Sequence, residues 1–383
     1  MKLYFQSVLK TFRDIAQNSS ILTTLVLSVF FYSFFYPTAY RAEQANQLPV
    51  VIVDEEQSVM TSRMITAVSK SPNVEIKAVT GNFAEAELMI KQQKADGILL
   101  LPYNLSNSLS RGEEGGIGLY LSAAYFLKTK EIGMGLALSV EQALSAELER
   151  FSKITHFSPP LSIHKVPLYN VMSGYGSYIF PAIAPLIIHQ TIVLGLGMLI
   201  GGYRERYWRP RAAEFWGCFS ALLLIGCLGC FYLFGFTFWL NDYPHGGNLW
   251  GMLLAVPIFI SCVIGFGMLI ASFLDMPERA GHLIVFSSIP IFLLSGAAWP
   301  HSAMPQWLQY FGNLLPSTQG IQMFLQLNQM GVPTSIVVPK LLYLIGFGAV
   351  MLLWAYYRLC IQPPRPARLI PSEQPNAPDA TNT

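Results

Sequence analysis

The residue types that could support catalysis or bind a metal are few and scattered along the chain. Cys227 and Cys230 have the C-x-x-C spacing of redox dithiols and zinc ligands, but they lie inside a long apolar run, which favours small packing residues. The six histidines stand singly, at His156, His164, His189, His245, His282 and His301. The sequence also lacks a P-loop, an H-E-x-x-H motif and a G-x-S-x-G motif. We therefore expect this chain to be no enzyme and to hold no metal or cofactor itself.

Two polar pairs are candidates for a binding site. His189 and Gln190 lie inside an apolar run of membrane length, where an ionisable residue without a partner is costly. They form a candidate intramembrane polar site, although an interhelical hydrogen bond at a subunit contact is the favoured interpretation. Asp54 and Glu55 follow a strand-like run and could bind a ligand or metal. Solvated turn residues that start the next helix are the favoured interpretation of this second pair.

Four arginines stand close together between two apolar runs of membrane length. The stretch GGYRERYWRPRA contains Arg204, Arg206, Arg209 and Arg211, with Glu205 among them. Guanidinium groups can form bidentate contacts with carboxylates, which predicts docking on an acidic partner. Arginines beside apolar runs also fix the orientation of a membrane protein, and both roles are compatible here.

These residues lie in a chain that has the composition of a membrane protein. Of its 383 residues, 52% are hydrophobic and only 12% are charged, about half the charged share of an average soluble domain. More than half of the charged residues fall between Arg41 and Lys165, and long stretches elsewhere are almost free of charge. The formal net charge of +2 is too small to indicate nucleic-acid binding.

The apolar runs predict six transmembrane helices, the first in residues 19–40 and the other five in residues 171–358. They are expected at Ile21–Tyr40, Tyr178–Gly201, Phe215–Leu240, Trp250–Phe273, His282–Ala298 and Ser335–Tyr357, of which the fifth is short. Residues 1–18 have apolar side chains at helical spacing, which predicts an amphipathic helix on the membrane surface. A cleaved signal peptide is the competing interpretation, but the first apolar run is longer than a usual signal core of about 7–15 residues.

The positions of lysine and arginine orient these helices. Basic residues occur in the N-terminal segment, in the loop 202–213 and after Tyr357, whereas the loop 241–248 and the segment 299–331 have none. Six helices place the three basic segments on one side of the membrane. The positive-inside rule then predicts that the loop 202–213 and both termini face the cytoplasm and that residues 41–170 face outward.

Residues 41–170 alternate between strand and helix patterns. Strand-like runs occur at Pro49–Asp54, Val74–Thr80, Asp96–Pro102 and Gly116–Ala123, and helical patterns at Ser58–Ser71, Phe83–Lys94 and about Leu127–Ser152. This alternation indicates a small α/β domain. The predicted fold class is therefore a polytopic α-helical membrane protein with an inserted extracytoplasmic α/β domain.

Three further segments need a separate interpretation. Residues 299–331 have no charge and predict a re-entrant or interfacial hairpin with aromatic anchors. Its candidate residues are Trp299, Pro300, Met304, Pro305, Trp307 and Pro316. Residues 174–185 contain two glycines and two prolines that could unwind the second transmembrane helix beside a substrate path, and an ordinary helix start explains them equally well. The tail 359–383 is polar and Pro-rich, which predicts disorder.

The order of these segments resembles a known family. The stretches PVVIVDEEQSVMTSRMITAVSKSP, KADGILLLPYNLSNSLSRGE, LYNVMSGYGSYIFPAIAPLIIHQT and SGAAWPHSAMPQWLQYFGNLLPSTQGIQMF follow one another in this order. They resemble the permease subunit of ABC-type-2 exporters, in the bacterial drug-efflux-like branch with a large extracytoplasmic domain between transmembrane helices one and two. The resemblance covers nearly the whole chain except the tail. One departure is that the family often continues from Arg-Glu-Arg into Gly-Thr-x-Glu, where this chain has YWRPRAAE.

The resemblance implies a transport subunit that is powered by a separate ATPase. The loop with Arg204, Glu205, Arg206, Arg209 and Arg211 would dock on that ATPase, which would bind ATP and magnesium. The resemblance also implies a second permease subunit, identical or paralogous, and export of a small or amphipathic substrate across a bacterial inner membrane. By analogy, the outward domain would recruit a periplasmic adaptor protein that leads to an outer-membrane channel.

Functions from other classes are compatible with several apolar helices. A membrane-anchored sensor or assembly factor would bind a ligand in the outward domain, but this sequence shows no cytoplasmic signalling domain. An ion-driven secondary transporter needs charged residues inside the membrane, and these apolar runs contain almost none. A membrane-embedded enzyme needs a catalytic cluster that the sequence does not show.

Overall fold

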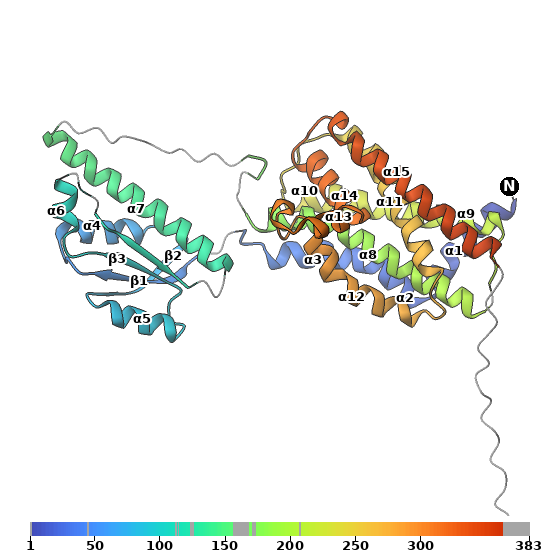
Figure 1. Ribbon diagram of the computed structural model, residues 1–383, viewed down its shortest axis with the longest axis horizontal. Helices are drawn as coiled ribbons and strands as arrows, with labels where there is room; N and C mark the ends of the chain where they lie inside the picture. The colour runs from blue at the N-terminus through green and yellow to red at the C-terminus, as the bar shows by residue number, and fades with distance from the viewer. Residues whose placement is uncertain are drawn as a thin grey trace, which may run out of the picture. The chain divides into compact units, whose positions relative to one another are not determined.

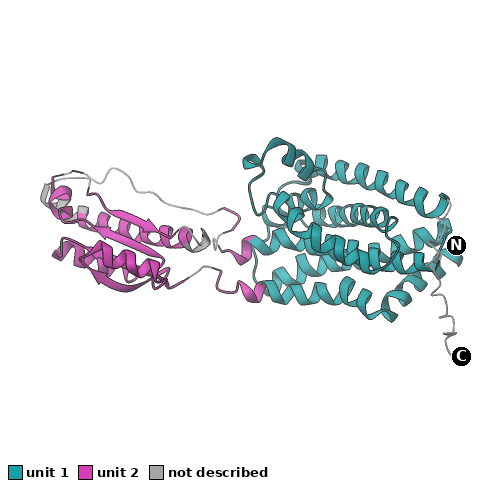
Figure 2. Ribbon diagram, turned by 60° about the horizontal axis from the view of Figure 1, so that its bottom comes forward, with its two compact units in different colours: residues 1–36, 179–383 teal, residues 37–178 magenta. Residues whose placement is uncertain are grey.

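The computed structural model describes residues 2–43, 46–111, 113, 115–122, 126–155, 168–170, 174–206 and 208–362. These residues form two compact units, which Figure 1 shows by element and Figure 2 by colour. Unit 1 comprises residues 1–36 and 179–383, and unit 2 comprises residues 37–178. Most of the tail predicted to be disordered, residues 363–383, lies outside the described residues.

Unit 2 is built on a four-stranded sheet with the strand order β2-β1-β3-β4. The strands are β1 (Leu48–Asp54), β2 (Val74–Thr80), β3 (Gly97–Leu101) and β4 (Gly118–Leu121). β1 pairs in parallel with β2 and β3, whereas β4 pairs antiparallel to β3. The continuous apolar run of β1 is explained by its central place, because a strand covered on both faces buries successive side chains. All four strands occur where the sequence predicts them.

Helices cover both faces of this sheet. α4 (Val59–Val68) and α7 (Phe126–Thr155) share a core with Val50 and Ile52, while α5 (Phe83–Lys91) packs with Val51 and Val53 on the other face. The short helix α6 (Leu105–Ser110) follows β3, and the sequence analysis did not predict it. Arg63 of α4 donates from Nε and one amino group to the Glu147 carboxylate of α7, at 2.7 and 2.6 Å. These hydrogen bonds raise the pKa of the Arg63 guanidinium and fix α4 against α7.

Unit 1 consists of helices. Its N-terminal part has α1 (Lys2–Gln17) and then α2 (Ser19–Leu22), η1 (Thr23–Leu27) and α3 (Ser28–Ala39), which continue one another. The central part has α8 (Gly176–Glu205), α9 (Ala212–Phe231), η2 (Tyr232–Thr237), α10 (Phe238–Leu240) and α11 (Leu249–Ala271). The C-terminal part has α12 (Glu278–Leu294), η3 (His301–Ala303), α13 (Gln306–Asn313), α14 (Pro316–Phe324), η4 (Leu325–Gln329), α15 (Thr334–Tyr356) and η5 (Tyr357–Ile361). α8 and α3 each run a few residues past the boundary of unit 1.

Five helices among the described residues are long and apolar enough to cross a membrane. They are Ser19–Ala39, Gly176–Glu205, Ala212–Leu240, Leu249–Ala271 and Thr334–Ile361. A polytopic membrane protein is therefore confirmed at this level, whereas six crossings stay a prediction. α8 continues without interruption through Pro181 and Pro185, so the prolines do not unwind it.

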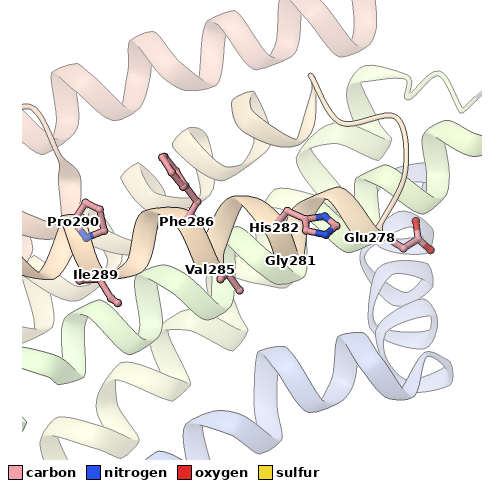
Figure 3. Close-up of a pocket in the computed structure, with 7 residues that line it drawn as sticks. All are labelled: Glu278, Gly281, His282, Val285, Phe286, Ile289 and Pro290. Atoms are coloured by element: carbon pink, nitrogen blue, oxygen red, sulfur yellow. The ribbon is translucent and has the colours of Figure 1, made fainter.

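The expected fifth span is occupied by α12, which has only 17 residues. At 1.5 Å per residue it is about 26 Å long, less than the about 30 Å of a typical hydrocarbon core. Val285, Phe286 and Ile289 project from α12 and are 78%, 84% and 68% exposed, respectively (Figure 3). With Glu278, Gly281, His282 and Pro290 they line a shallow groove of about 630 Å³.

The hairpin after α12 packs against the first half of α15. Near its turn, Leu314 accepts a hydrogen bond from Tyr343 through its carbonyl oxygen, at 3.0 Å. Farther along the hairpin, Gln326 accepts one from Lys340, at 3.1 Å. Tyr343 lies about 14 Å and Lys340 about 9 Å along α15 from its first residue. The turn at Leu314 therefore contacts α15 farther from its first residue than Gln326 does, while the re-entrant and interfacial interpretations of the hairpin both stay predictions.

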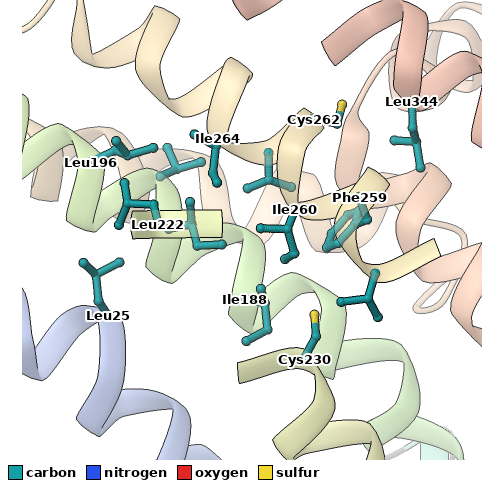
Figure 4. Close-up of a cluster of buried hydrophobic side chains, with 14 of the residues drawn as sticks. Leu25, Ile188, Leu196, Leu222, Cys230, Phe259, Ile260, Cys262, Ile264 and Leu344 are labelled. Atoms are coloured by element: carbon teal, nitrogen blue, oxygen red, sulfur yellow. The ribbon is translucent and has the colours of Figure 1, made fainter. Parts of the chain in front are cut away.

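The core of unit 1 is a continuous apolar cluster around α8, α9 and α11 (Figure 4). α11 packs along α15, and small residues allow the two backbones to approach. A Cβ atom built on Gly348 of α15 would lie 2.8 Å from Cys262 Cα, and one on Gly265 of α11 would lie 2.9 Å from the Gly348 carbonyl oxygen. Neither position has room for a side chain. The packing of these two helices therefore depends on both glycines.

The N-terminal helix α1 packs on α9 by its polar face. Ser7, Thr11 and Ile15 are buried, while Phe5 and Leu9 are 60% and 68% exposed. Ser7 donates to the carbonyl oxygen of Glu214 at 3.3 Å. This arrangement leaves Phe5 and Leu9 on the face of α1 that points away from the other helices of unit 1, as expected of a helix that lies at a membrane surface.

The close approach of α11 and α15 gives the first prediction. We expect Gly348→Val to lower the thermal stability of the solubilised protein, because overpacking costs about 1–3 kcal/mol. Gly346→Val is the matched control, since nothing lies within 4 Å of a Cβ atom at that position. Heating followed by size-exclusion chromatography measures the midpoint of both variants. Equal midpoints would contradict the proposed packing constraint.

Candidate functional site

The loop between α8 and α9 is shorter than the predicted 202–213. α8 continues to Glu205 and α9 begins at Ala212, so only residues 206–211 connect the two helices. Arg206, Arg209 and Arg211 are exposed, whereas the side chain of Arg204 is only 24% exposed. The predicted coupling residues therefore fall into two groups. Arg204 turns inward, and the other charged residues of the group face solvent.

Arg204 and Arg358 meet at the end of α11. Ser272 caps this helix, and its carbonyl oxygen accepts hydrogen bonds from Arg204 and, at 3.4 Å, from Arg358. Arg358 also donates from Nε to the Ser272 hydroxyl at 2.9 Å. The last carbonyl groups of a helix have no partner within the helix, and cations at this end are favourable. The two guanidinium groups therefore complete α11, and we call this arrangement the Ser272 clamp.

Weaker contacts surround the Ser272 clamp. The Arg358 guanidinium lies 3.8 Å from the centre of the Phe273 ring, a cation–π geometry. Arg204 is 3.9 Å from a carboxylate oxygen of Asp275, which also binds Arg279 at 3.1 Å. Asp275 is about half exposed, so these ion pairs add little stability. Their effect is to hold the segment between α11 and α12 close to the end of α8.

Contacts with α1 hold the other side of the loop. Tyr203 donates to a carboxylate oxygen of Asp14 at 2.5 Å, and its ring centre lies 4.7 Å from that of Trp208. Lys10 lies over the Tyr203 ring, 5.7 Å from its centre. α1, the end of α8, the loop 206–211, the end of α11 and η5 thus gather at one end of unit 1. We call it the basic end.

Comparison with known proteins identifies the family to which the chain belongs. A family described as ABC-2 family transporter protein matches residues 19–357. The chain belongs to the ABC-2 transporter family. The search of curated proteins finds no match. Members of this family are the membrane component of an ABC transporter, and membership implies a partner ABC ATPase.

Within this ABC-2 protein, His189 and Gln190 lie near the middle of α8. His189 is 1% exposed, and its ring centre lies 5.7 Å from that of Phe266 of α11. Neither nitrogen of His189 and neither amide atom of Gln190 has a hydrogen-bond partner among the described residues. Such a buried group costs about 1–3 kcal/mol. The predicted hydrogen bond at a subunit contact stays a prediction, and within the described residues this polar pair has unused hydrogen-bonding capacity.

The predicted hairpin residues divide between surface and core. Trp299, Pro300, Pro305 and Trp307 are exposed, and Met304 is half-buried. Pro316 is buried at the first turn of α14, where proline is favoured because that turn needs no backbone donor. Exposed tryptophans at a hairpin are typical of anchors at the membrane interface. The structure therefore gives Pro316 a role in building α14 rather than in the exposed surface.

The remaining candidates for ligand, metal or redox chemistry are explained by their packing and hydrogen bonds. Asp54 is buried rather than solvated, because its carboxylate accepts from the backbone of Gln57 and the hydroxyl of Thr61, both at 2.9 Å. The predicted turn role is right, and the predicted exposure is wrong. Cys230 is fully buried in the core, and Cys227 packs against it, as expected of packing residues. The described residues contain no group of three His, Cys, Asp or Glu side chains able to hold a metal.

Several residues of the basic end and the hairpin could not be recognised in the sequence. Ser272 follows an apolar run with no motif of its own, and Asp14 looked like one charged residue of an amphipathic helix. Ser317 and Thr318 of α14 are fully buried, and their hydroxyl oxygens have no partner in the described part of the chain. The only sequence signal for them was their place directly after Pro316, inside a charge-free hairpin.

The Ser272 clamp predicts that Arg204 and Arg209 differ in their effect on stability. Arg204→Gln removes a charged donor from the end of α11 and is expected to destabilise the protein by about 1–2 kcal/mol, since hydrogen bonds to charged groups are worth about 1.5–3 kcal/mol when well buried. Arg209→Gln, at an exposed position of the same loop, should change stability by less than about 0.5 kcal/mol.

Thermal midpoints of the solubilised variants test this difference, and Arg204→Gln with Arg358→Gln completes a double-mutant cycle. Because both side chains donate to one oxygen, we expect their effects not to add. Additive effects, or equal midpoints for Arg204→Gln and Arg209→Gln, would show that the Ser272 clamp does not hold the end of α11.

Proposed function

We propose that this chain is the permease subunit of an ATP-driven exporter. The observation that carries the proposal is the arrangement of the basic end in a chain of the ABC-2 family. The exposed guanidinium groups of Arg206, Arg209 and Arg211 lie beside Arg204, which is fixed to the end of α11. A partner that binds the exposed group can therefore displace α8 and α11 together. The partner ATPase would bind ATP and magnesium, and this chain would bind neither.

We also propose which side of the membrane each part of the chain faces. The basic end faces the cytoplasm by the positive-inside rule, which places the partner ATPase on the same side. α1 belongs to the basic end, and one candidate span, Ser19–Ala39, separates it from most of unit 2. Unit 2 would then be an extracytoplasmic domain, as in the drug-efflux-like branch of the family. Six crossings, with the short helix α12 as the fifth, return the C-terminus to the cytoplasm.

The transport pathway would be completed by a second permease subunit, identical or paralogous. The substrate would be small or amphipathic and would leave across the bacterial inner membrane. His189 and Gln190, with their unused hydrogen-bonding capacity inside the bundle, are the residues we propose for a polar site that acquires partners as the helices move. Unit 2 would recruit an adaptor protein leading to an outer-membrane channel. The sensor alternative is not favoured, because family membership already accounts for the membrane part of the chain.

Purification from the native membrane tests the central claim. We expect the tagged chain, extracted in mild detergent, to retain a P-loop ATPase in an equal amount, identified by mass spectrometry. The reason is that this chain has no P-loop of its own and ABC-2 proteins work with a separate ATPase. Repeated recovery of folded chain without any ATPase would contradict the proposal.

Charge reversal tests the docking surface. The double variant Arg209→Glu and Arg211→Glu should lose the ATPase, or its stimulation, by at least tenfold while still inserting into the membrane, because like charges would replace attraction. Lys70→Glu with Lys94→Glu is the matched control, with the same change in net charge at exposed positions of unit 2. An unchanged ATPase activity in the loop variant, or an equal loss in the control, would exclude the exposed arginines as the docking surface.

A further inference from the structure

The proposed function does not account for a cavity at the basic end, although one of its lining residues, Arg206, also belongs to the exposed arginines proposed to bind the ATPase. It has a volume of about 1100 Å³ and lies between α1, the start of α2, the C-terminal half of α8 and the start of α12. Its size is that of a site for a small molecule or cofactor rather than for a single ion. The lining residues used below come from all four of these elements, which makes it a built cavity and not a feature of one helix end.

The walls of the cavity change from apolar to polar in one direction. On α8 the lining runs from Leu194 and Met198 to Glu205, a distance of about 17 Å along the helix, and continues to Arg206 of the loop. On the opposite wall it runs from Ile21 of α2 through the hydroxyls of Ser19 and Ser20 to Lys10 of α1. Both walls therefore have apolar side chains at the end of the cavity farther from the loop 206–211. Their polar side chains lie at the end nearer to this loop. This is the polarity profile of a membrane lipid with its headgroup at the surface.

Charges of both signs face the polar part of the cavity. Lys10 and Arg206 supply two cations, and Glu205 and Glu278 supply two carboxylates. All four side chains are exposed, and no ion pair joins any of them within the described part of the chain. A third carboxylate, Asp14, also lines the cavity but accepts the hydroxyl of Tyr203. Two cations and two free carboxylates thus share one cavity without neutralising each other.

We infer that this cavity binds one phospholipid with a zwitterionic headgroup that carries a phosphate and a primary ammonium group. The phosphate would contact Lys10 and Arg206, and the ammonium would donate to Glu205 and Glu278. An acyl chain would lie along Ile21, Leu194 and Met198. A purely anionic headgroup would face two unpaired carboxylates, and a trimethylammonium headgroup has no N–H to donate to them. The site chemistry therefore selects the ammonium lipid.

The position of α1 supports a lipid as the occupant. Phe5 and Leu9 of α1 are exposed on the face away from α9, where they would enter the membrane interface. The same helix contributes Lys10 to the cavity. A lipid in the leaflet next to α1 would thus have its headgroup beside Lys10 while its acyl chains stay in the membrane.

Lipid retention by the purified full-length chain tests the inference. The delipidated protein is titrated in mixed micelles with dioleoyl phosphatidylethanolamine, phosphatidylcholine or phosphatidylglycerol, and native mass spectrometry counts the bound lipids. We expect one phosphatidylethanolamine to be retained at least tenfold more tightly than either of the others. Equal retention of the three lipids, or a preference for phosphatidylglycerol, would overturn the inference.

Two double variants separate the two halves of the headgroup. Lys10→Gln with Arg206→Gln should weaken binding of phosphatidylethanolamine at least tenfold. Glu205→Gln with Glu278→Gln should remove the preference for phosphatidylethanolamine over phosphatidylcholine. Lys2→Gln with Arg13→Gln is the matched control for the first variant, because it removes two exposed basic residues of α1 that do not line the cavity. An equal effect of this control would show binding by general charge and would overturn the site.

A soluble competitor separates a lipid from a free phosphate compound. Glycerophosphoethanolamine has the same headgroup without acyl chains and should displace the lipid only at concentrations at least a hundredfold higher, since it leaves the apolar walls unfilled. Displacement by equal concentrations would assign the cavity to a soluble molecule instead. The variants replace exposed side chains by polar ones of similar size, and a normal size-exclusion profile for each confirms that the fold is kept.

Discussion

The end of helix α11 is the point on which the arrangement of the basic end depends. A helix leaves its last carbonyl groups without partners, and α11 ends in the interior of a bundle rather than in open water. Ser272 obtains its donors from Arg204 and Arg358, which come from parts of the chain far away in sequence. α8 must therefore reach Glu205 before it turns, and α15 must continue through η5. The three helices are joined at the place where the loop 206–211 begins.

This joining has a mechanical consequence for transport. The small residues Gly265 and Gly348 hold α11 and α15 in close contact, and the Ser272 clamp ties both to α8. A force on the loop would then move a rigid group of helices rather than one helix alone. Helix groups that move as bodies are a common basis for alternating between two states. His189 and Gln190 lie inside this group, where a shift of α8 against its neighbours changes the atoms that surround them.

Much of the fold could be predicted from the sequence because its signals are local. The strands of unit 2 are recognisable from short apolar runs and from alternating apolar and polar residues. The long helices of unit 1 are recognisable from long uncharged runs. The contacts of single side chains could not be predicted in this way. Arg204 turns inward because Ser272, 68 positions later, needs a donor. Asp54 is buried because Thr61, one turn into the next helix, offers a hydroxyl to its carboxylate.

The hairpin is a second case in which the sequence predicted the elements but not their side-chain contacts. Its lack of charge and its prolines were enough to predict two short helical segments that do not span the membrane. The packing of its turn against α15 became clear only from the hydrogen bonds of Leu314 and Gln326. The hydroxyls of Ser317 and Thr318 are buried because neighbouring helices, rather than water, enclose the first turn of α14.

The shortness of α12 bears on the bilayer itself. As the proposed fifth crossing, a helix about 26 Å long would match a hydrocarbon layer about 30 Å thick only by thinning it, tilting its neighbours or drawing headgroups inward. The exposed side chains of Val285, Phe286 and Ile289 mark where lipid tails would meet this mismatch. Thicker membranes, with longer or more ordered acyl chains, would then press on the segment next to the hairpin.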